Sequence, residues 1–340
     1  MRNYRAVLNG IFINMTLHEN KDLFRQAILA TAAQRQMAEI YVEKDYWLTA
    51  ALHKIFHSPA AAYTVFKGGT ALSKAHRLIE RFSEDLDMVV IHHPGDSSNQ
   101  LKNKLKVISG TVTELIPETE LNGITNKKGM IRKTAHTYEK MGVAGVYGQV
   151  RETIILEATW LGTAEPHIRL PISSYISDMM VLRGQDVLVE QYGLAPFPIS
   201  VLSKERTFCE KIMSLVRFSL TKDPYTDLAN KIRHIYDLHM MLKDPAVQQF
   251  LEGQNFNTML IQVGTDDLAS FKNNNAWLAN PPWQSIIFNN PAGTWQQIRS
   301  PYQTRFKSLV IGVLPEEQEL IASLERIGRR LRAVPWHIQS

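Results

Sequence analysis

The amino-acid sequence predicts an α+β fold with a largely helical C-terminal half. Short runs rich in β-branched residues are concentrated between about residues 60 and 200, and apolar residues at helical spacing occupy both flanks. A chain of 340 residues, 44% of them hydrophobic, can bury one large core or two ordinary ones. We expect residues 1–200 to form a sheet-containing core with N-terminal helices, and residues 201–340 to form a helical C-terminal domain.

The first elements surround an unusual segment. Apolar spacing predicts two helices over 18–57, and AYTVF at 62–66 predicts a short strand that ends just before a glycine pair. TALSKAHRLIER at 70–81 places its apolar residues on one helical face, and LDMVVIH at 86–92 predicts a second strand. The unit is therefore a strand, a Gly-Gly turn, a helix and a strand.

The rest of the chain follows from periodicity and turn residues. We expect a helix over 99–121, a hairpin or mobile loop over 123–149, a strand over 151–160, helices over 201–220 and 227–242, a turn-rich region over 250–300 and a helix over 315–334. The last helix opens with proline and acidic residues and ends in arginines, which complement its dipole.

Composition limits where this protein acts and what it binds. Cys209 is the only cysteine, so an intramolecular disulfide and a cysteine-rich zinc site are excluded, and we expect an inert buried thiol. Residues 1–20 lack the sustained apolar region of a signal peptide, and no run reaches the ~20 apolar residues of a membrane span. We expect a cytoplasmic protein with no membrane partner. The net charge of +5 mildly favours a polyanionic partner.

Two aspartates stand at the head of the second predicted strand. Because side chains alternate along a strand, Asp85 and Asp87 point to one face, and apolar Leu86 and Met88 point to the other. Two carboxylates this close repel each other unless a cation lies between them, and Mg²⁺ is a suitable one. Taken alone, such a pair is more often a solvated strand end or turn.

The glycine pair could hold a phosphate. Gly68 and Gly69 allow the backbone to approach an anion, and Ser73 and Lys74 could add a hydroxyl and an ammonium group. Taken alone, such a pair is usually a tight turn, and the spacing is not that of a Walker A loop. The combination with the aspartates is more specific, since it would place a metal beside a bound polyphosphate, as nucleotidyl transfer requires.

The residues in this segment carry a family resemblance. GGTALSK followed by RFSEDLDMVV resembles the signature of the AbiEii/AbiGii-type nucleotidyltransferase toxins, which are relatives of the DNA polymerase β superfamily. VEKDYWLT upstream, and ERTFCEKIMSL and RHIYDLHMML downstream, match in the same order, so the resemblance spans about residues 40–245. It implies a polymerase-β-like nucleotidyltransferase core with a small mixed sheet and flanking helices. It also implies an NTP donor and Mg²⁺, with Mn²⁺ as an alternative.

The resemblance also implies a biological setting and residue roles. Members are often toxins of toxin–antitoxin or phage-defence systems, some modify tRNA, and a cognate antitoxin would be a partner. Asp85 and Asp87 match the metal-binding catalytic aspartates. Gly68, Gly69 and Ser73 match the triphosphate site, where Lys74 either helps or is a solvated helix lysine.

Three further residues are candidates for the site. Lys211 matches the downstream lysine, which would neutralise charge on the phosphates; the alternative is a lysine whose stem covers the edge of the core. Asp237 matches the late aspartate and would orient Lys211 or the nucleotide; the alternative is an ion pair with Arg233. Glu157 would be a third metal carboxylate or an edge-strand residue facing water. We expect structural roles for Lys44 and Asp45, which also match.

The sequence indicates how an acceptor could bind only through its basic segments and its aromatic residues. The basic segments 101–106, 127–134 and 326–332 are either solvated faces or binding surfaces for a phosphate backbone. Aromatic candidates for stacking an unpaired nucleotide are Tyr138, Tyr147 and Trp160.

The sequence therefore predicts a Mg²⁺-dependent nucleotidyltransferase that moves a nucleotide from an NTP to a hydroxyl. By family analogy the acceptor is an RNA 3′ end, tRNA especially. The alternatives are a protein acceptor, a glycosyltransferase with an Asp-x-Asp metal site, and a non-catalytic binding module on the same fold.

Overall fold

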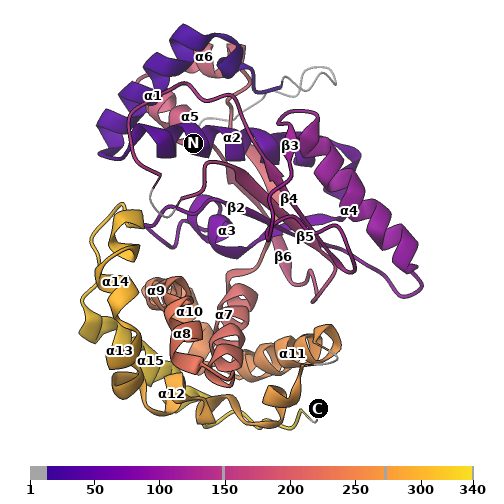
Figure 1. Ribbon diagram of the computed structural model, residues 1–340, viewed down its shortest axis with the longest axis vertical. Coiled ribbons are helices and arrows are strands. Elements are labelled where there is room, and N and C mark those ends of the chain that lie inside the picture. The colour runs from indigo at the N-terminus through magenta and orange to yellow at the C-terminus, as the bar shows by residue number, and fades with distance from the viewer. Residues whose placement is uncertain (1–13, 148–149, 272–273, 339–340) are drawn as a thin grey trace.

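A mixed β-sheet lies at the centre of the N-terminal part of the molecule (Figure 1). The computed structural model describes residues 14–147, 150–271 and 274–338, so part of the N-terminal stretch considered above, residues 1–13, lies outside the described residues. Within these ranges the sheet has seven strands in the order β3-β4-β5-β2-β1-β7-β6. Their bounds are β1 Thr64–Lys67, β2 Asp85–Val90, β3 Glu118–Thr119, β4 Ile131–His136, β5 Ile154–Thr159, β6 His167–Ile172 and β7 Phe197–Leu202.

Helices cover the face of the sheet that carries the apolar side chains of β2. They are α1 Lys21–Arg35, α2 Glu39–Phe56, α4 Ser98–Thr113, α5 Tyr175–Leu182 and α6 Asp186–Gln191 (Figure 1). Leu86 and Met88 are fully buried in one cluster with residues of these helices. Since side chains alternate along β2, Asp85 and Asp87 point to the opposite face, toward the C-terminal half.

The helix after the glycine pair is shorter than predicted. α3 spans Gly68–Lys74, whereas the apolar pattern predicted a helix over 70–81. Three residues after the helix ends at Lys74, Arg77 has a left-handed φ of 55°. Residues 80–82 then run beside residues 309–312, with hydrogen bonds from Phe82 N to Leu309 O and from Ile311 N to Glu80 O. Residues 309–312 therefore form hydrogen bonds with backbone groups that a longer helix would have used itself.

The C-terminal half is helical, as predicted. Its helices are α7 Lys204–Ser219, α8 Pro224–Ala229, α9 Ile232–Met241, α10 Pro245–Glu252, α11 Gln254–Ser270, α12 Ile286–Asn289, α13 Pro291–Ile298, α14 Ser300–Gln303 and α15 Glu317–Leu331. Two expectations were wrong. The helix predicted over 227–242 is two helices, and the region 250–300, predicted to be turn-rich, contains α11. The buried face of α11 carries Phe256, Leu260 and Val263 at helical spacing.

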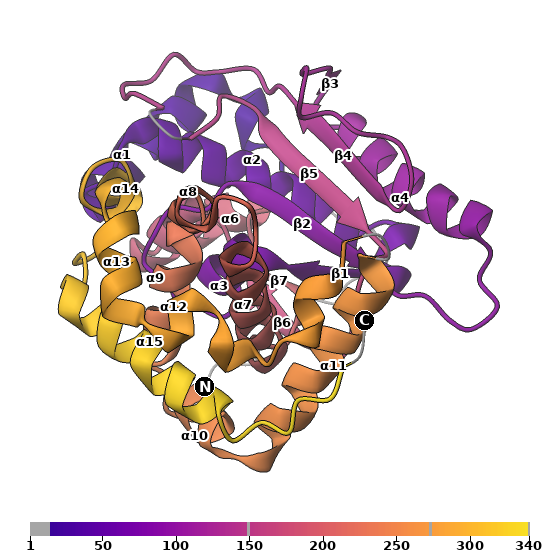
Figure 2. The same cartoon turned by 60° about the horizontal axis from the view of Figure 1, so that its bottom comes forward.

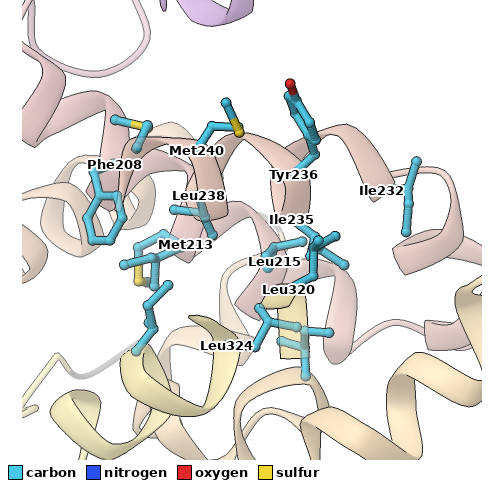
Figure 3. Packing of buried hydrophobic residues seen from close by; sticks show 14 of the residues in the cluster. Phe208, Met213, Leu215, Ile232, Ile235, Tyr236, Leu238, Met240, Leu320 and Leu324 are labelled. Carbon is cyan, nitrogen blue, oxygen red and sulfur yellow. The ribbon is translucent and has the colours of Figure 1, made fainter. Parts of the chain in front are cut away.

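The helix α7 is held between the sheet and the other C-terminal helices (Figure 2). Figure 3 shows its side chains Met213 and Leu215 near Ile235 and Leu238 of α9 and near Leu320 of α15. Each of these side chains is at most 1% exposed, and burying one stabilises the fold by about 1.5–3 kcal/mol. This packing fixes α7 across the face of the sheet that carries the two aspartates.

None of the helices within the described ranges is long and apolar enough to cross a membrane. The expected division of the chain at residue 200 falls inside β7, two residues before that strand ends at Leu202.

Candidate active site

Four charged residues form one row across the sheet. Lys67 on β1 is the register partner of Asp87 on β2, Asp87 is the partner of Glu157 on β5, and Glu157 is the partner of Lys133 on β4. Register partners in neighbouring strands point to the same face. The row therefore places Glu157 beside Asp87. Glu157 forms an ion pair with Lys133, at 2.9 Å between Oε2 and Nζ.

The two aspartates of β2 lack sufficient counter-charge. Burial, and then the neighbouring carboxylates Asp85 and Glu157, raise the pKa of Asp87 to about 7. Asp85 Oδ1 is buried and accepts no hydrogen bond within the described residues, although Arg151 Nη1 lies 3.5 Å away. Two neighbouring carboxylates that lack sufficient counter-charge are suitable oxygen ligands for a divalent cation. As they stand, no three His, Cys, Asp or Glu side chains in the described part of the chain converge into a metal site.

Gly68 lies directly against Asp87, and Gly69 lies against Arg81 and Ser83. Gly68 has a φ of +79°, and a Cβ at this position would overlap Asp87 Oδ2 and lie 3.0 Å from Asp87 Cγ. A Cβ at Gly69 would lie 2.6 Å from Arg81 Nη2 and 2.9 Å from Ser83 Oγ. The positive φ and the close approach to Asp87 favour glycine at position 68, and its backbone can reach this carboxylate for that reason.

A cavity of about 630 Å³ opens in front of Asp85 and Asp87. It is strongly basic, since six cationic side chains line it against these two carboxylates: Arg81, Arg151, Lys211, Lys231, Arg233 and Arg305. Ser83 and His234 line it as well. Burial and then the nearby Lys211 and Lys231 hold the pKa of His234 well below its usual range. We refer to this space as the first cavity.

Sequence reasoning found only part of this cavity. Arg81 and Ser83 lie inside the motif RFSEDLD, where a serine two residues and an arginine four residues before the first aspartate were a usable signal. Lys231 and Arg305 come from distant segments and carried no such signal. Arg233 was considered only as an ion-pair partner of Asp237.

Asp237 links the cavity wall to the loop after α3. Arg81 donates to both its carboxylate oxygens, at 2.7 and 2.8 Å, and Lys211 Nζ lies 2.7 Å from Oδ2. Burial alone would raise the pKa of Asp237, but the charges of Arg81 and Lys211 hold it well below its usual range. Within the described residues Asp237 makes no ion pair with Arg233, which lines the first cavity instead.

The structure does not bring Ser73 and Lys74 to the aspartates. One turn further along α3, both line a separate cavity. Lys74 is buried and forms an ion pair with Asp45, at 2.5 Å, while Ser73 bonds the hydroxyl of Tyr175. The long-range partner Asp45 thus holds the ammonium group on the far side of the corner.

Lys44 holds the residue that precedes β2, Glu84, through a buried ion pair. Its side chain is fully buried, 2.5 Å from Glu84 Oε2, and it also donates to the carbonyls of Arg151 and Thr153. Glu84 directly precedes Asp85, and its Oε2 accepts from the backbone N–H of Arg151. These buried contacts agree with the structural role expected for this residue.

Glu157 lines a second cavity, of about 360 Å³, which borders the row of charged residues on its other side. Helix α7 contributes Glu210 and Ser214 to it, whereas the neighbouring Lys211 faces the first cavity. Helix α11 contributes Asp266 and Asp267. We refer to this space as the second cavity.

Three further expectations from the sequence concern Tyr138, Cys209 and the basic segment 326–332. Tyr138 cannot stack a nucleotide as it stands, because its ring is 3% exposed and packs on Trp47. Cys209 is fully buried, and burial raises the pKa of its thiol, so the expectation of an inert thiol holds. In the segment 326–332, Arg326 pairs with Glu252 and Arg330 bonds the backbone of Leu251.

The chain is similar to known nucleotidyltransferase toxins in sequence family and in fold. Residues 50–319 match the family described as "Nucleotidyl transferase AbiEii toxin, Type IV TA system". No curated protein matches the chain in sequence. Among solved structures, the fold is similar to MenT4, nucleotidyltransferase toxin Rv2826c from Mycobacterium tuberculosis H37Rv, with a TM-score of 0.51 and 16% identity, over 91% of this chain and 89% of that chain. This likeness confirms the predicted fold class. Because the family match covers most of its length, the chain belongs to the AbiEii nucleotidyltransferase toxins.

Proposed function

We propose that this protein transfers a nucleotide from an NTP to a hydroxyl on an RNA 3′ end, with Mg²⁺ bound at Asp85 and Asp87. The observation that carries the proposal is the first cavity, where six cationic side chains line the same space as Asp85, whose Oδ1 accepts no hydrogen bond within the described residues, and Asp87. Such a site attracts a polyanion and a divalent cation together, as the donor of a nucleotidyl transfer requires.

The donor triphosphate would lie against the cations of the first cavity. Lys231, Arg233 and Arg305 line it and form no ion pair with a carboxylate among the described residues. The backbone at Gly68 and Gly69, with the Ser83 hydroxyl, would hold the phosphates near the aspartates. Ser73 and Lys74 are assigned to holding α3 in place rather than to the nucleotide.

The metal would be held by Asp85 and Asp87, with Glu157 as a third carboxylate. Asp85 Oδ1, which accepts no hydrogen bond within the described residues, and the raised pKa of Asp87 fit this role. When bound, Mg²⁺ or Mn²⁺ would neutralise the triphosphate and activate the attacking hydroxyl. Lys133 forms an ion pair with Glu157, so this ion pair would have to break before Glu157 could bind the metal.

The reaction is an in-line displacement at the α-phosphorus. The acceptor oxygen forms a bond to this phosphorus, the bond from the phosphorus to the bridging oxygen breaks, and pyrophosphate leaves. The acceptor proton passes to a carboxylate of the row or to water. Lys211, held by Asp237, would stabilise the charge that builds on the phosphates. We propose that residues 201–340 form a helical domain that supplies Lys211 and Asp237.

The biological setting follows from the family. As a toxin of a type IV toxin–antitoxin system, the protein would act with an antitoxin partner. We propose that it acts in the cytoplasm, where a lone cysteine stays reduced, and that tRNA is the acceptor in a phage-defence role.

The test is incubation of the purified protein with Mg²⁺, each NTP labelled at the α-phosphate, and total RNA or total protein. We expect label in RNA, and its loss in the double variant Asp85→Asn/Asp87→Asn. Asp186→Asn, on exposed α6, is the matched control and should label as well as wild type. Label in protein would move the acceptor to a side-chain hydroxyl. Transfer of a sugar alone from a nucleotide-sugar would support a glycosyltransferase, and toxicity that survives in the double variant would support a non-catalytic module.

A further inference from the structure

The two cavities share one face of the sheet and are separated by the row of charged residues. Asp87 lines the first cavity, while its register partner Glu157 lines the second. Helix α7 crosses the same face, with Lys211 in the first cavity and Ser214 in the second. The candidate metal carboxylates therefore belong to both spaces.

We propose that the second cavity is the acceptor subsite and that it selects a nucleoside end with free hydroxyls and no terminal phosphate. This inference rests on the proposed function. In an in-line displacement, the attacking and leaving oxygens lie on opposite sides of the phosphorus. With the triphosphate in the first cavity, the attacking hydroxyl approaches from the side of Glu157, which is the second cavity.

The charges of the second cavity argue against a phosphate there. Four carboxylates line it against three cations, and two of these cations are already paired with carboxylates. Lys67 pairs with Glu210 at 3.1 Å, and Arg206 pairs with Glu210 at 3.3 Å and with Asp266. The third cation, Arg217, has its Cζ 4.3 Å from the ring centroid of Phe271. A ligand that brings hydrogen-bond donors fits such a lining, and one that brings negative charge is repelled.

Two polar groups in this lining lack partners. Asp267 makes no side-chain hydrogen bond or ion pair within the described residues. Arg206 has a side chain that is 1% exposed, and its Nη1 donor has no partner. An acceptor and a donor would match the amino group and ring nitrogen of a nucleobase, or the hydroxyls of a ribose. The volume of about 360 Å³ is within the range of small-ligand pockets, and Phe271 adds an aromatic ring to its wall.

The exposed basic segment beside the cavity favours RNA over protein. Ile131 lines the second cavity and belongs to the segment 127–134. Lys128, three residues earlier, is exposed, as is Lys127, which pairs with Glu118. The phosphates that precede a terminal nucleoside would pass along this segment, outside the acid-lined cavity.

The test separates donor binding from acceptor binding. For Asp267→Asn we expect the KM for the RNA acceptor to rise about tenfold, with the affinity for a fluorescent NTP analogue, titrated without acceptor, changed less than twofold. Arg233→Ala, in the first cavity, should give the reverse pattern. Thermal melting of both variants checks that the fold is retained.

Competition tests the chemistry of the ligand. Adenosine and cytidine should inhibit labelling in competition with RNA, and their 3′-monophosphates should inhibit at least tenfold more weakly. In Asp267→Asn the difference in inhibition between the nucleosides and their 3′-monophosphates should be smaller than in the wild type. An unchanged acceptor KM in a folded Asp267→Asn variant, or equal inhibition by nucleosides and monophosphates, would overturn the subsite while leaving the transferase intact. Absence of NTP binding and of any transfer would instead sink the proposed function, and the subsite with it.

Discussion

Arg81, in the loop between α3 and β2, donates two hydrogen bonds to Asp237 on α9, from Nε at 2.7 Å and from Nη2 at 2.8 Å. Both side chains are buried, and the same carboxylate holds Lys211. One residue of the helical half thus fixes the loop that leads into β2 and the lysine that faces the first cavity.

Replacing Asp237 should therefore destabilise the whole protein. In Asp237→Asn, Arg81 and Lys211 keep their charges in a buried site without a counter-charge, and breaking a buried pair in this way typically costs about 3–5 kcal/mol. Urea unfolding at pH 7 measures this cost, with Asp186→Asn on the exposed helix α6 as the control. Because the folded pKa of Asp237 is depressed, its contribution is present above the unfolded pKa and is lost on acidification. Equal stability of the two variants would refute the linking role.

Gly68 should not tolerate a methyl group. Gly68→Ala combines a positive φ with a Cβ that overlaps Asp87 Oδ2, so the carboxylate has to move. We expect transfer activity to fall at least 100-fold. The matched control is Gly184→Ala, where φ is +69° and nothing lies within 4 Å of the added Cβ. Both variants carry similar backbone strain, but only Gly68→Ala should lose activity. Comparable losses in the two would show that strain alone accounts for the effect.

Lys133 should weaken the binding of a metal at the row of charged residues. Its ammonium group pairs with Glu157 at 2.9 Å, so a divalent cation there meets a like charge. We expect Lys133→Met to raise the affinity for Mn²⁺, measured by electron paramagnetic resonance, about tenfold. Lys128→Met, in the same segment but exposed, controls for the general loss of positive charge. An unaltered Mn²⁺ affinity in Lys133→Met would argue against Glu157 as a ligand.

The local part of the candidate site could be predicted from the sequence. The period of two along β2 is enough to place Asp85 and Asp87 on one face and Leu86 on the other. The glycine pair marks the start of α3, where a side chain at Gly68 would collide with Asp87. Each of these inferences depends on neighbours within a few residues.

The parts that could not be predicted depend on distant partners. The pattern over 70–81 is helical, but pairing with residues 309–312 ends α3 at Lys74. The sequence leaves Lys74 either beside the phosphates or solvated, whereas in the structure Asp45 on α2 holds it in another cavity. Arg305 reaches the first cavity from a region with no recognisable motif. Tertiary contacts of this kind leave no local pattern in the sequence.

Asp267 should make the stability of the protein depend on pH near neutrality. Burial, together with the nearby Glu210 and Asp266, raises its pKa to about 7, although Arg217 and Lys67 act in the opposite direction. Since the folded pKa lies above the unfolded value of 3.8, the folded state keeps a proton that the unfolded state loses. The resulting stability is fully present below about pH 4 and is lost as pH rises through about 7.

Asp267→Asn mimics the protonated carboxyl at every pH. It should match the wild type in urea unfolding at pH 4 and exceed it at pH 8, where the wild-type carboxylate is charged and buried. Asp266→Asn is the informative control, because it breaks the ion pair with Arg206 and should lose stability at pH 8 instead. If Asp267→Asn is less stable than the wild type at pH 8, the Asp267 carboxylate has a stabilising partner and is not free to accept a hydrogen bond from a ligand.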